Sequence, residues 1–320
     1  MTPGRRRLAA GLALAGWAGA AGACRRTPEA RLEGTVTLLG AWALYPMALK
    51  WGEEFHKAHP QITIDVQAGG AGKGVADVLS GMVDLGMVSR DIRPEEVARG
   101  PRPFAVTKDA VVAMVSADNP FLREIRAKGL TPAALRDVWI GGRPSEWGRL
   151  LGLPARESVH VFTRSDACGA AETWAAFLGG RQEDLAGVGV YGDPGLADAV
   201  RRDPLGIGYN NVNFAYDAGT LRPVAGLAVV PIDLDGSGSV EPGESFYGTR
   251  GELTAAIAAG SYPSPPACDL YLVARGKPSR PAVIEFLAWV LTEGQAFVPE
   301  AGYIRLGPDK LAEGLRLLGR

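Results

Sequence analysis

The fold is decided by the stretch from Thr35 to Ser89, which reads TVTLLGAWALYPMALKWGEEFHKAHPQITIDVQAGGAGKGVADVLSGMVDLGMVS. Between its apolar β-like runs, apolar residues recur at helical spacing over 44–55 and again over 75–79. The three β-like runs are 35–39, 62–66 and 83–89. This order predicts a β-α-β-α-β unit, and therefore a mostly parallel sheet whose ligands bind where strands end and helices begin.

The rest of the chain continues the α/β pattern and predicts two lobes. A long β-rich run, Val106–Ser116, can cross from one lobe to the other, and the chain returns through Tyr262–Ala274. We therefore expect a discontinuous first lobe (34–108 and 265–320) with a second lobe (109–264) inserted into it. The helices predicted in these parts are 132–139, 170–178 and a terminal helix at 281–291.

Composition supports an ordinary globular protein. The chain has 320 residues, of which 47% are hydrophobic and 22% charged, and its 43 glycines and 23 prolines suit many tight turns. Without the three arginines at 5–7, the chain carries 31 basic and 35 acidic residues, a net charge of −4. This balance argues against a nucleic-acid partner, which needs a basic face.

The N-terminus has the layout of a signal peptide over residues 1–23. Three arginines precede an uncharged run, Leu8–Ala23, that is shorter than the ~20 residues of a membrane span. Ala21-Gly22-Ala23-Cys24 resembles a lipobox, in which Cys24 becomes lipid-anchored and 24–33 forms a tether. The alternative is cleavage to a free secreted protein, so either interpretation predicts an exported protein, periplasmic or at the cell surface.

Several segments resemble the substrate-binding proteins of phosphate ABC importers, the PstS-like family. They are GAWALYP at 40–46, AGGAGKGV at 68–75, VDLGMVSR at 83–90 and VFTRSDACGA at 161–170, with YP at 262–263, DLYLV at 269–273 and GYIRL at 302–306. The resemblance implies the type II periplasmic-binding-protein clamshell, each lobe a mostly parallel sheet flanked by helices. It also implies a monomer that is not an enzyme and that passes phosphate to an ABC permease.

The predicted ligand site consists of loops that precede helices. Free N–H groups at helix starts, together with the helix dipole, favour an anion in the loops 42–46, 70–74 and 168–170. Arg164 can add a charged bidentate donor, and Arg90 could be a second. The predicted ligand-binding residues are Leu44, Tyr45, Gly70, Ala71, Gly72, Ser89, Arg90, Arg164, Cys168, Gly169 and Ala170.

The identity of the ligand stays open because this chain departs from the family at four hydroxyl positions. These positions are Leu44, Ala71 (or Gly70), Cys168 and Ala170. Each lost hydrogen bond to a charged ligand is worth ~1.5–3 kcal/mol. Phosphate is the first expectation, and a different oxyanion, including one attracted to the Cys168 thiol, is the alternative. A phosphate-releasing hydrolase is the third hypothesis, although the sequence offers no activated nucleophile for it. No organic cofactor is expected, since the loop 68–74 lacks nucleotide-binding spacing.

A separate segment, DLDGSGSVEPGE at 233–244, fits the twelve-residue calcium-loop template. The template predicts a structural Ca²⁺ in a lone loop, because no long helix is expected behind it. The alternative is an acidic surface loop. The predicted metal ligands are Asp233, Asp235, Ser237, Ser239 and Glu244, with Gly238 at the turn.

The cysteines leave two interpretations. If Cys24 carries lipid, Cys168 and Cys268 are the remaining pair for an oxidising compartment. They could form a disulfide that staples the lobes, or they could be two separate thiols. Because Cys168 precedes a predicted helix and lies near Arg164, we expect its thiol pKa to be lowered.

Overall fold

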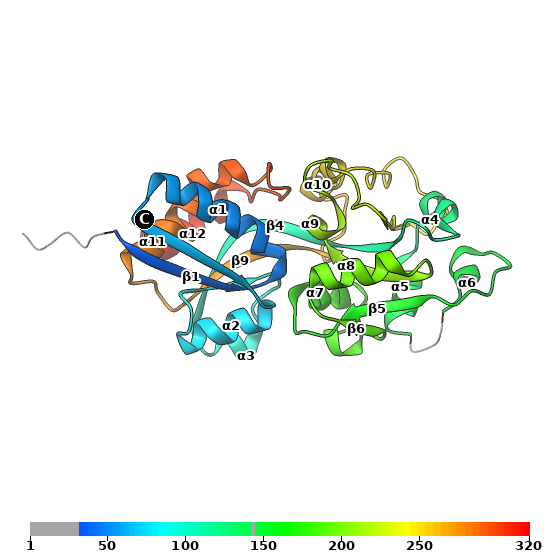
Figure 1. Cartoon of the computed structure of the whole chain (residues 1–320), viewed down its shortest axis with the longest axis horizontal. Helices are drawn as coiled ribbons and strands as arrows, with labels where there is room; N and C mark the ends of the chain where they lie inside the picture. The colour runs from blue at the N-terminus through cyan, green and yellow to red at the C-terminus, as the bar shows by residue number, and fades with distance from the viewer. Residues whose placement is uncertain (1–31, 142–144) are drawn as a thin grey trace, which may run out of the picture. The chain divides into compact units, whose positions relative to one another are not determined.

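A computed structural model describes residues 32–141 and 145–320 (Figure 1). The predicted signal peptide, Cys24 and most of the predicted tether lie outside the described residues. None of the described helices combines the length and the apolar character that crossing a bilayer requires.

The described strands join in a single sheet with the order β2-β1-β3-β9-β4-β7-β5-β6, and β8 pairs with β4. Their bounds are β1 Gly34–Gly40, β2 Ile62–Ala68, β3 Leu85–Val88, β4 Pro101–Ser116, β5 His160–Arg164, β6 Val188–Val190, β7 Gly206–Asn211, β8 Leu227–Val229 and β9 Ala267–Arg275. β1 runs parallel to β2 and β3, and β5 runs parallel to β6 and β7. The predicted α/β fold is confirmed, and the sheet is mixed because β9 and β4 join the two parallel sets by antiparallel pairing.

Helices follow most of these strands. The α-helices are α1 Tyr45–Ala58, α2 Ala71–Ser80, α3 Pro94–Val97, α4 Leu122–Lys128, α5 Pro132–Trp139, α6 Trp147–Leu151, α7 Gly169–Phe177, α8 Asp193–Arg202, α9 Val212–Ala215, α10 Arg250–Ala259, α11 Pro281–Leu291 and α12 Pro308–Leu318. Three short 3₁₀ helices are η1 Trp42–Leu44, η2 Gln182–Asp184 and η3 Glu293–Phe297.

Two of the predicted helices, α5 and α11, have the bounds that the sequence predicted. α5 has its predicted bounds because Thr131 caps it, its hydroxyl accepting from the Ala134 N–H at 3.1 Å, with Pro132 in the first turn. α11 also has its predicted bounds. It is not the terminal helix, however, because α12 follows it.

Two long strands carry the chain between two hydrophobic cores (Figure 1). β4 pairs with β9 over Pro101–Ala110 and with β7 over Val111–Val115. β4 begins five residues before the predicted start of the crossing run, because its first part extends the sheet of the first core.

The two cores divide along these strands. The first core holds Trp51, Phe55 and Phe286, and the Phe55 and Phe286 rings pack edge-to-face at 5.2 Å. The second holds Trp139 and Trp174, whose rings meet at 5.3 Å. Along β4 the first core ends at Val106 and the second begins at Ala110, and along β9 the second ends at Ala267 and the first resumes at Leu270. We call the parts around these cores the first and second lobes.

Candidate oxyanion site and calcium loop

Two of the three loops that were predicted to form the site, those at the starts of α2 and α7, meet across the two lobes. A Cβ on Gly70 would lie 2.7 Å from the carbonyl oxygen of Ala167, and one on Gly72 would lie 3.2 Å from the Ala167 Cβ. A Cβ on Gly169 would overlap Ser89. Glycine at these positions therefore lets the start of α2 and the end of β3 reach the start of α7.

The start of α2 offers backbone donors. Gly69 and Gly70 donate their N–H groups to the Gly40 carbonyl at 2.8 and 2.9 Å, which fixes the loop against β1. The next N–H groups, of Ala71 and Gly72, belong to the first helical turn and have no acceptor within the helix. They are the donors of α2 that an anion can use.

The start of α7 is built in the same way, with Cys168 as its cap. The Cys168 Sγ accepts the Ala171 N–H at 3.4 Å, and the Cys168 N–H donates to Gln182 at 3.1 Å. The N–H groups of Gly169 and Ala170 remain without an acceptor in the helix. Cys168 thus replaces a hydroxyl residue as helix cap.

The first predicted loop differs from the other two. The Leu44 N–H donates to the Ala41 carbonyl at 3.1 Å, and the Tyr45 N–H donates to the Trp42 carbonyl. Pro46, which follows, has no N–H. The prediction that the Tyr45 N–H is a free donor was therefore wrong, because the 3₁₀ turn η1 uses it.

Arg164 is buried and already paired with two carboxylates. Its Nε and Nη2 donate to the Asp166 carboxylate at 2.8 and 2.6 Å, and Nη1 donates to Asp193. The Asp193 carboxylate also accepts from the Asn211 side chain. Only 1% of the Arg164 side chain is exposed, so its guanidinium is held in one orientation.

Arg90 connects the two lobes. Its Nη1 and Nη2 donate to Glu96 at 2.8 and 2.7 Å, and its Nε lies 2.9 Å from the Glu172 carboxylate on α7. Arg93 donates to the same Glu172. Arg90 is therefore an ion-pair partner across the lobes rather than an unpaired donor.

The side chains around the loops carry more negative than positive charge. Three arginines (Arg90, Arg93, Arg164) face four carboxylates (Glu96, Glu172, Asp166, Asp193). An anion would therefore depend mainly on backbone N–H groups. The four carboxylates were not among the predicted site residues. Only Asp166 had a signal in the sequence, since it belongs to the RSD segment.

Both described cysteines are free thiols, so the disulfide hypothesis for Cys168 and Cys268 was wrong. Burial raises the pKa of the Cys168 thiol to about 11, although Arg164 works in the opposite direction. Burial likewise raises the pKa of Cys268 to about 12. The expected lowering of the Cys168 pKa was also wrong, because desolvation outweighs the nearby cation.

Aromatic side chains from both lobes gather beside these loops. The Trp42 ring meets those of Tyr45, Tyr191 and Phe214 edge-on, at 6.1, 6.5 and 6.5 Å. A Cβ on Gly192 would lie 3.4 Å from the Trp42 ring. Trp42 therefore contributes to the contact between the lobes.

A cavity of about 520 Å³ opens on the Arg90 side of this contact. Its walls include Arg90 and Glu172, together with Thr173, Cys268 and Lys108. Among the predicted ligand-binding residues, Arg90 alone lines it. The helix-start donors therefore lie outside this cavity.

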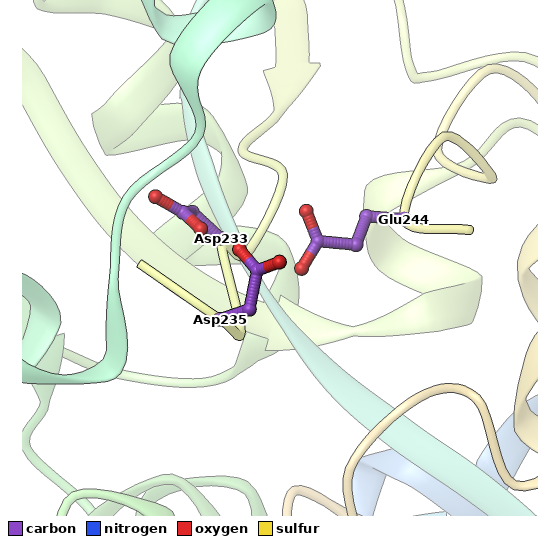
Figure 2. Close-up of side chains that lie close together, drawn as sticks. All are labelled: Asp233, Asp235 and Glu244. Carbon is purple, nitrogen blue, oxygen red and sulfur yellow. The ribbon is translucent and has the colours of Figure 1, made fainter. Parts of the chain in front are cut away.

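The predicted calcium loop brings its three carboxylates together. Oxygen atoms of Asp233, Asp235 and Glu244 lie within 4.8 Å of one another. Figure 2 shows Glu244 reaching from the other end of the loop toward Asp235. Asp233 and Glu244 are 2% and 8% exposed, and no cationic side chain of the described residues pairs with any of the three.

The backbone of this loop is organised around Asp233. The N–H groups of Gly236, Ser237 and Gly238 all donate to its carboxylate, at 2.8, 3.1 and 2.9 Å. Ser237 donates its hydroxyl to the Ser239 carbonyl at 2.9 Å, so the two other predicted ligands adjoin each other. Glu241, at the ninth template position, was not predicted and accepts from the Ser239 hydroxyl at 3.0 Å.

Comparison with known proteins gives a consistent result. The family model described as the PBP superfamily domain matches residues 26–293. Phosphate-binding protein PstS of Pseudomonas aeruginosa is 28% identical over 307 residues, covering 88% of this chain and 86% of its own length. Phosphate-binding protein PstS of Methanocaldococcus jannaschii is 24% identical, with 83% and 81% covered.

Solved structures agree at the level of the fold. A substrate-binding protein from Clostridium perfringens with bound phosphate superposes with a TM-score of 0.69 at 20% identity, covering 86% of this chain and all of that one. An ABC-type phosphate transport receptor from Vibrio cholerae gives a TM-score of 0.62 at 17% identity, with 85% and 100% covered.

Proposed function

Because the chain belongs to the PBP superfamily, we propose that it is the substrate-binding protein of an ABC importer and that it holds inorganic phosphate between its lobes. The observation that carries the proposal is the contact between the starts of α2 and α7. Two helix N-termini with unused N–H groups meet there, beside the oriented guanidinium of Arg164. The relatives named as phosphate-binding proteins support the choice of phosphate.

The same proposal covers how the protein works in the cell. It is exported, is anchored by lipid at Cys24, acts as a monomer and passes phosphate to an ABC permease. Mass spectrometry of the membrane-extracted protein should find an acylated Cys24 as the first residue, and Cys24→Ala should release the protein into the soluble fraction. An unmodified mature N-terminus at another residue would contradict the anchor.

Binding without catalysis is part of the proposal. A phosphomonoester such as phenyl phosphate should not be hydrolysed, since no described residue near the helix starts is an activated nucleophile: burial keeps the Cys168 thiol protonated, with a pKa of about 11. Steady release of phosphate by purified protein, lost in Cys168→Ala, would overturn this part.

Calorimetry with phosphate, arsenate, sulfate and molybdate tests the ligand. The variant Ala71→Pro tests whether the start of α2 contacts the ligand. It removes one N–H at the first helical position, where proline is tolerated. Phosphate affinity should fall about tenfold or more, as for a lost hydrogen bond to an anion, ~1.5–3 kcal/mol.

Ala71→Ser is the matched control, because it keeps the N–H and adds a hydroxyl. It should bind phosphate at least as tightly as the unchanged protein. Equal phosphate affinity in Ala71→Pro and Ala71→Ser would remove the start of α2 from the site. Absence of phosphate binding to the unchanged protein, with tight binding of another oxyanion, would leave the fold assignment intact and replace the ligand.

We also propose that the loop 233–244 binds one structural Ca²⁺. Two buried carboxylates and one exposed carboxylate converge there without a cationic partner among the described residues, and in the same loop the Ser237 hydroxyl donates to the Ser239 carbonyl. Hard oxygen ligands at this spacing suit Ca²⁺. The helix that follows, α10, begins only at Arg250, so the site is a single loop without the paired helices of a sensor.

Thermal unfolding tests the calcium site. A chelator should lower the melting temperature, and added Ca²⁺ should raise it again. At a Ca²⁺ concentration of 100 times the Kd, binding should add about 2.7 kcal/mol to the free energy of unfolding. Glu244→Gln should abolish the response to Ca²⁺, whereas Asp137→Asn, at a half-exposed surface position, should keep it. A melting temperature that does not respond to chelator or Ca²⁺ would leave an ordinary surface loop.

A further inference from the structure

A second cavity lies in the second lobe, away from the helix-start loops. It has a volume of about 490 Å³ and lies between α4, the segment leading into β8 and the end of the calcium loop. Its charged lining residues are two arginines, and no carboxylate lines it. The complete lining is Arg126, Arg222, Pro223, Leu227, Val229, Pro231, Val240, Ser245, Tyr247 and Gly248.

One side of this cavity is apolar and fixed. Leu227 and Val229 belong to β8 and are 4% and 5% exposed. Tyr247 is 7% exposed, its hydroxyl accepts the Ile232 N–H at 3.1 Å, and its carbonyl accepts from Tyr216 at 2.9 Å. Such a wall can hold the apolar body of a ligand without rearranging.

The two arginines are available. Neither the Arg126 nor the Arg222 side chain has a hydrogen-bond or ion-pair partner in the part of the chain that the structure describes, whereas Arg123 on the same helix pairs with Glu124 at 2.9 Å. Guanidinium groups beside an apolar wall suit carboxylate and phosphonate heads, which they can bind through two parallel hydrogen bonds.

The backbone next to Arg222 is unusual. Leu221 has φ = 58°, the one positive value for a non-glycine residue among the described residues. Its N–H donates to the Asp217 carbonyl at 3.0 Å, and its carbonyl accepts the Arg250 N–H at 2.8 Å, so both neighbours hold it in place. A strained φ of this kind persists in a non-glycine residue where the surrounding structure fixes that residue. Because Leu221 is fixed, the backbone of the next residue, Arg222, starts from a fixed position.

We propose that this cavity binds a small organic anion, with its charged head on Arg126 and Arg222 and its apolar body on Leu227, Val229 and Tyr247. The ligand class is a carboxylate or phosphonate that carries a ring or a short alkyl chain. This site is separate from the proposed phosphate site and does not depend on it, because it shares no residue with the loops at α2 and α7.

The experiment titrates phenylphosphonate by calorimetry into protein saturated with inorganic phosphate, so that the proposed phosphate site is occupied. One further equivalent of phenylphosphonate should bind. Benzyl alcohol, which has the body without the charge, should not bind. The double variant Arg126→Gln/Arg222→Gln should weaken phenylphosphonate binding at least tenfold, whereas Arg123→Gln should leave it unchanged.

A second variant guards against an indirect effect of the charge changes. Ser245→Phe fills the cavity from its exposed rim and should abolish phenylphosphonate binding, while the affinity for phosphate and the melting temperature stay unchanged. No binding to the phosphate-saturated protein, equal binding in the double arginine variant, or equal binding of benzyl alcohol would each overturn the proposal. Loss of phenylphosphonate binding in Ala71→Pro with no loss in the arginine variant would place the probe at the helix starts and also overturn it.

Discussion

Asp109 is a buried carboxylic acid whose environment disfavours its charge. It lies on β4 opposite Cys268 of β9, and 1% of it is exposed. Neither carboxylate oxygen meets hydrogen-bond geometry with a partner in the described residues. Burial raises its pKa from 3.8 to about 7, and the nearby N–H groups of Ala110 and Val212 and the Arg250 guanidinium offset burial only in part.

The first prediction follows from this pKa. Between pH 4 and 7 the folded chain keeps the Asp109 proton that the unfolded chain loses, so the contribution of Asp109 to folding stability falls as pH rises, by about 4 kcal/mol in total. Asp109→Asn removes this penalty. Its stability relative to the unchanged protein should therefore increase from pH 4.5 to pH 8, as measured by urea unfolding. The exposed control Asp137→Asn should show no such trend, and a constant difference for Asp109→Asn would contradict the prediction.

Cys168 gives the second prediction. Serine at this position would still cap α7, and its hydroxyl could donate to an anion between the lobes. Cys168→Ser should tighten phosphate binding about tenfold, the lower end of ~1.5–3 kcal/mol for a charged hydrogen bond. Calorimetric titration of phosphate into Cys168→Ser and into the unchanged protein measures this difference in affinity. Loss of oxyanion binding in Cys168→Ser would instead favour the alternative ligand that contacts the thiol.

Residue types alone could not predict how the arginines are used. Arg164 and Arg90 were identified as cations near the site, and the structure places both next to the helix starts. Two of their partners, Asp193 and Glu172, could not be predicted, because they lie far from the arginines in sequence and meet them only through the packing of α8 and α7. The net negative charge around the loops is therefore a tertiary property.

At the scale of elements, a side-chain cap did not decide which helices were predicted: α11 was predicted with its observed bounds although it has no side-chain cap, and α10 was missed despite its capping box. Thr131 and Pro132 mark the start of α5, and the glycine turn marks the start of α2. The 3₁₀ turn η1 has no such signal, so the loss of the Tyr45 donor could not be foreseen. α12 was missed although Pro308 stands in its first turn, as Pro281 does in α11.

The third prediction concerns the cap of α10, the helix after the loop 233–244. The Thr249 hydroxyl accepts the Glu252 N–H at 3.2 Å, and the Glu252 carboxylate accepts the Thr249 N–H at 2.9 Å. Thr249→Ala should cost about 1 kcal/mol of folding stability. Urea unfolding measures it, with Thr254→Ala in the same helix as the control for loss of a hydroxyl outside the cap. An equal effect of the two substitutions would contradict the role of the cap.

At the scale of the whole molecule, one hydrogen-bonded sheet joins two cores. The β-α-β-α-β unit and the crossing run were predicted, because both depend on local apolar patterns. The insertion of β9 between β3 and β4 was not evident from any local pattern, since β9 lies more than 150 residues after β4 in the chain.

The fourth prediction is that both lobes unfold together. Leu38 and Leu135 are buried in different cores, at 1% and 0% exposure. Leu38→Ala and Leu135→Ala should each destabilise the protein by about 2–5 kcal/mol. Calorimetric unfolding should show one transition that moves in both variants, because the sheet continues from core to core. Two transitions, each sensitive to one substitution, would show that the lobes unfold independently.

The place of β9 in the sheet also constrains the order in which a newly synthesised chain can assemble. β3 and β4 both pair with β9, so before it arrives each has an edge of unpaired backbone groups. The sheet formed by residues 34–108 therefore lacks its β9 strand until the whole second lobe has been made. During this interval the exposed strands are open to pairing with another chain. The yield of folded protein should therefore be more sensitive to changes in and after β9 than the small size of that segment suggests.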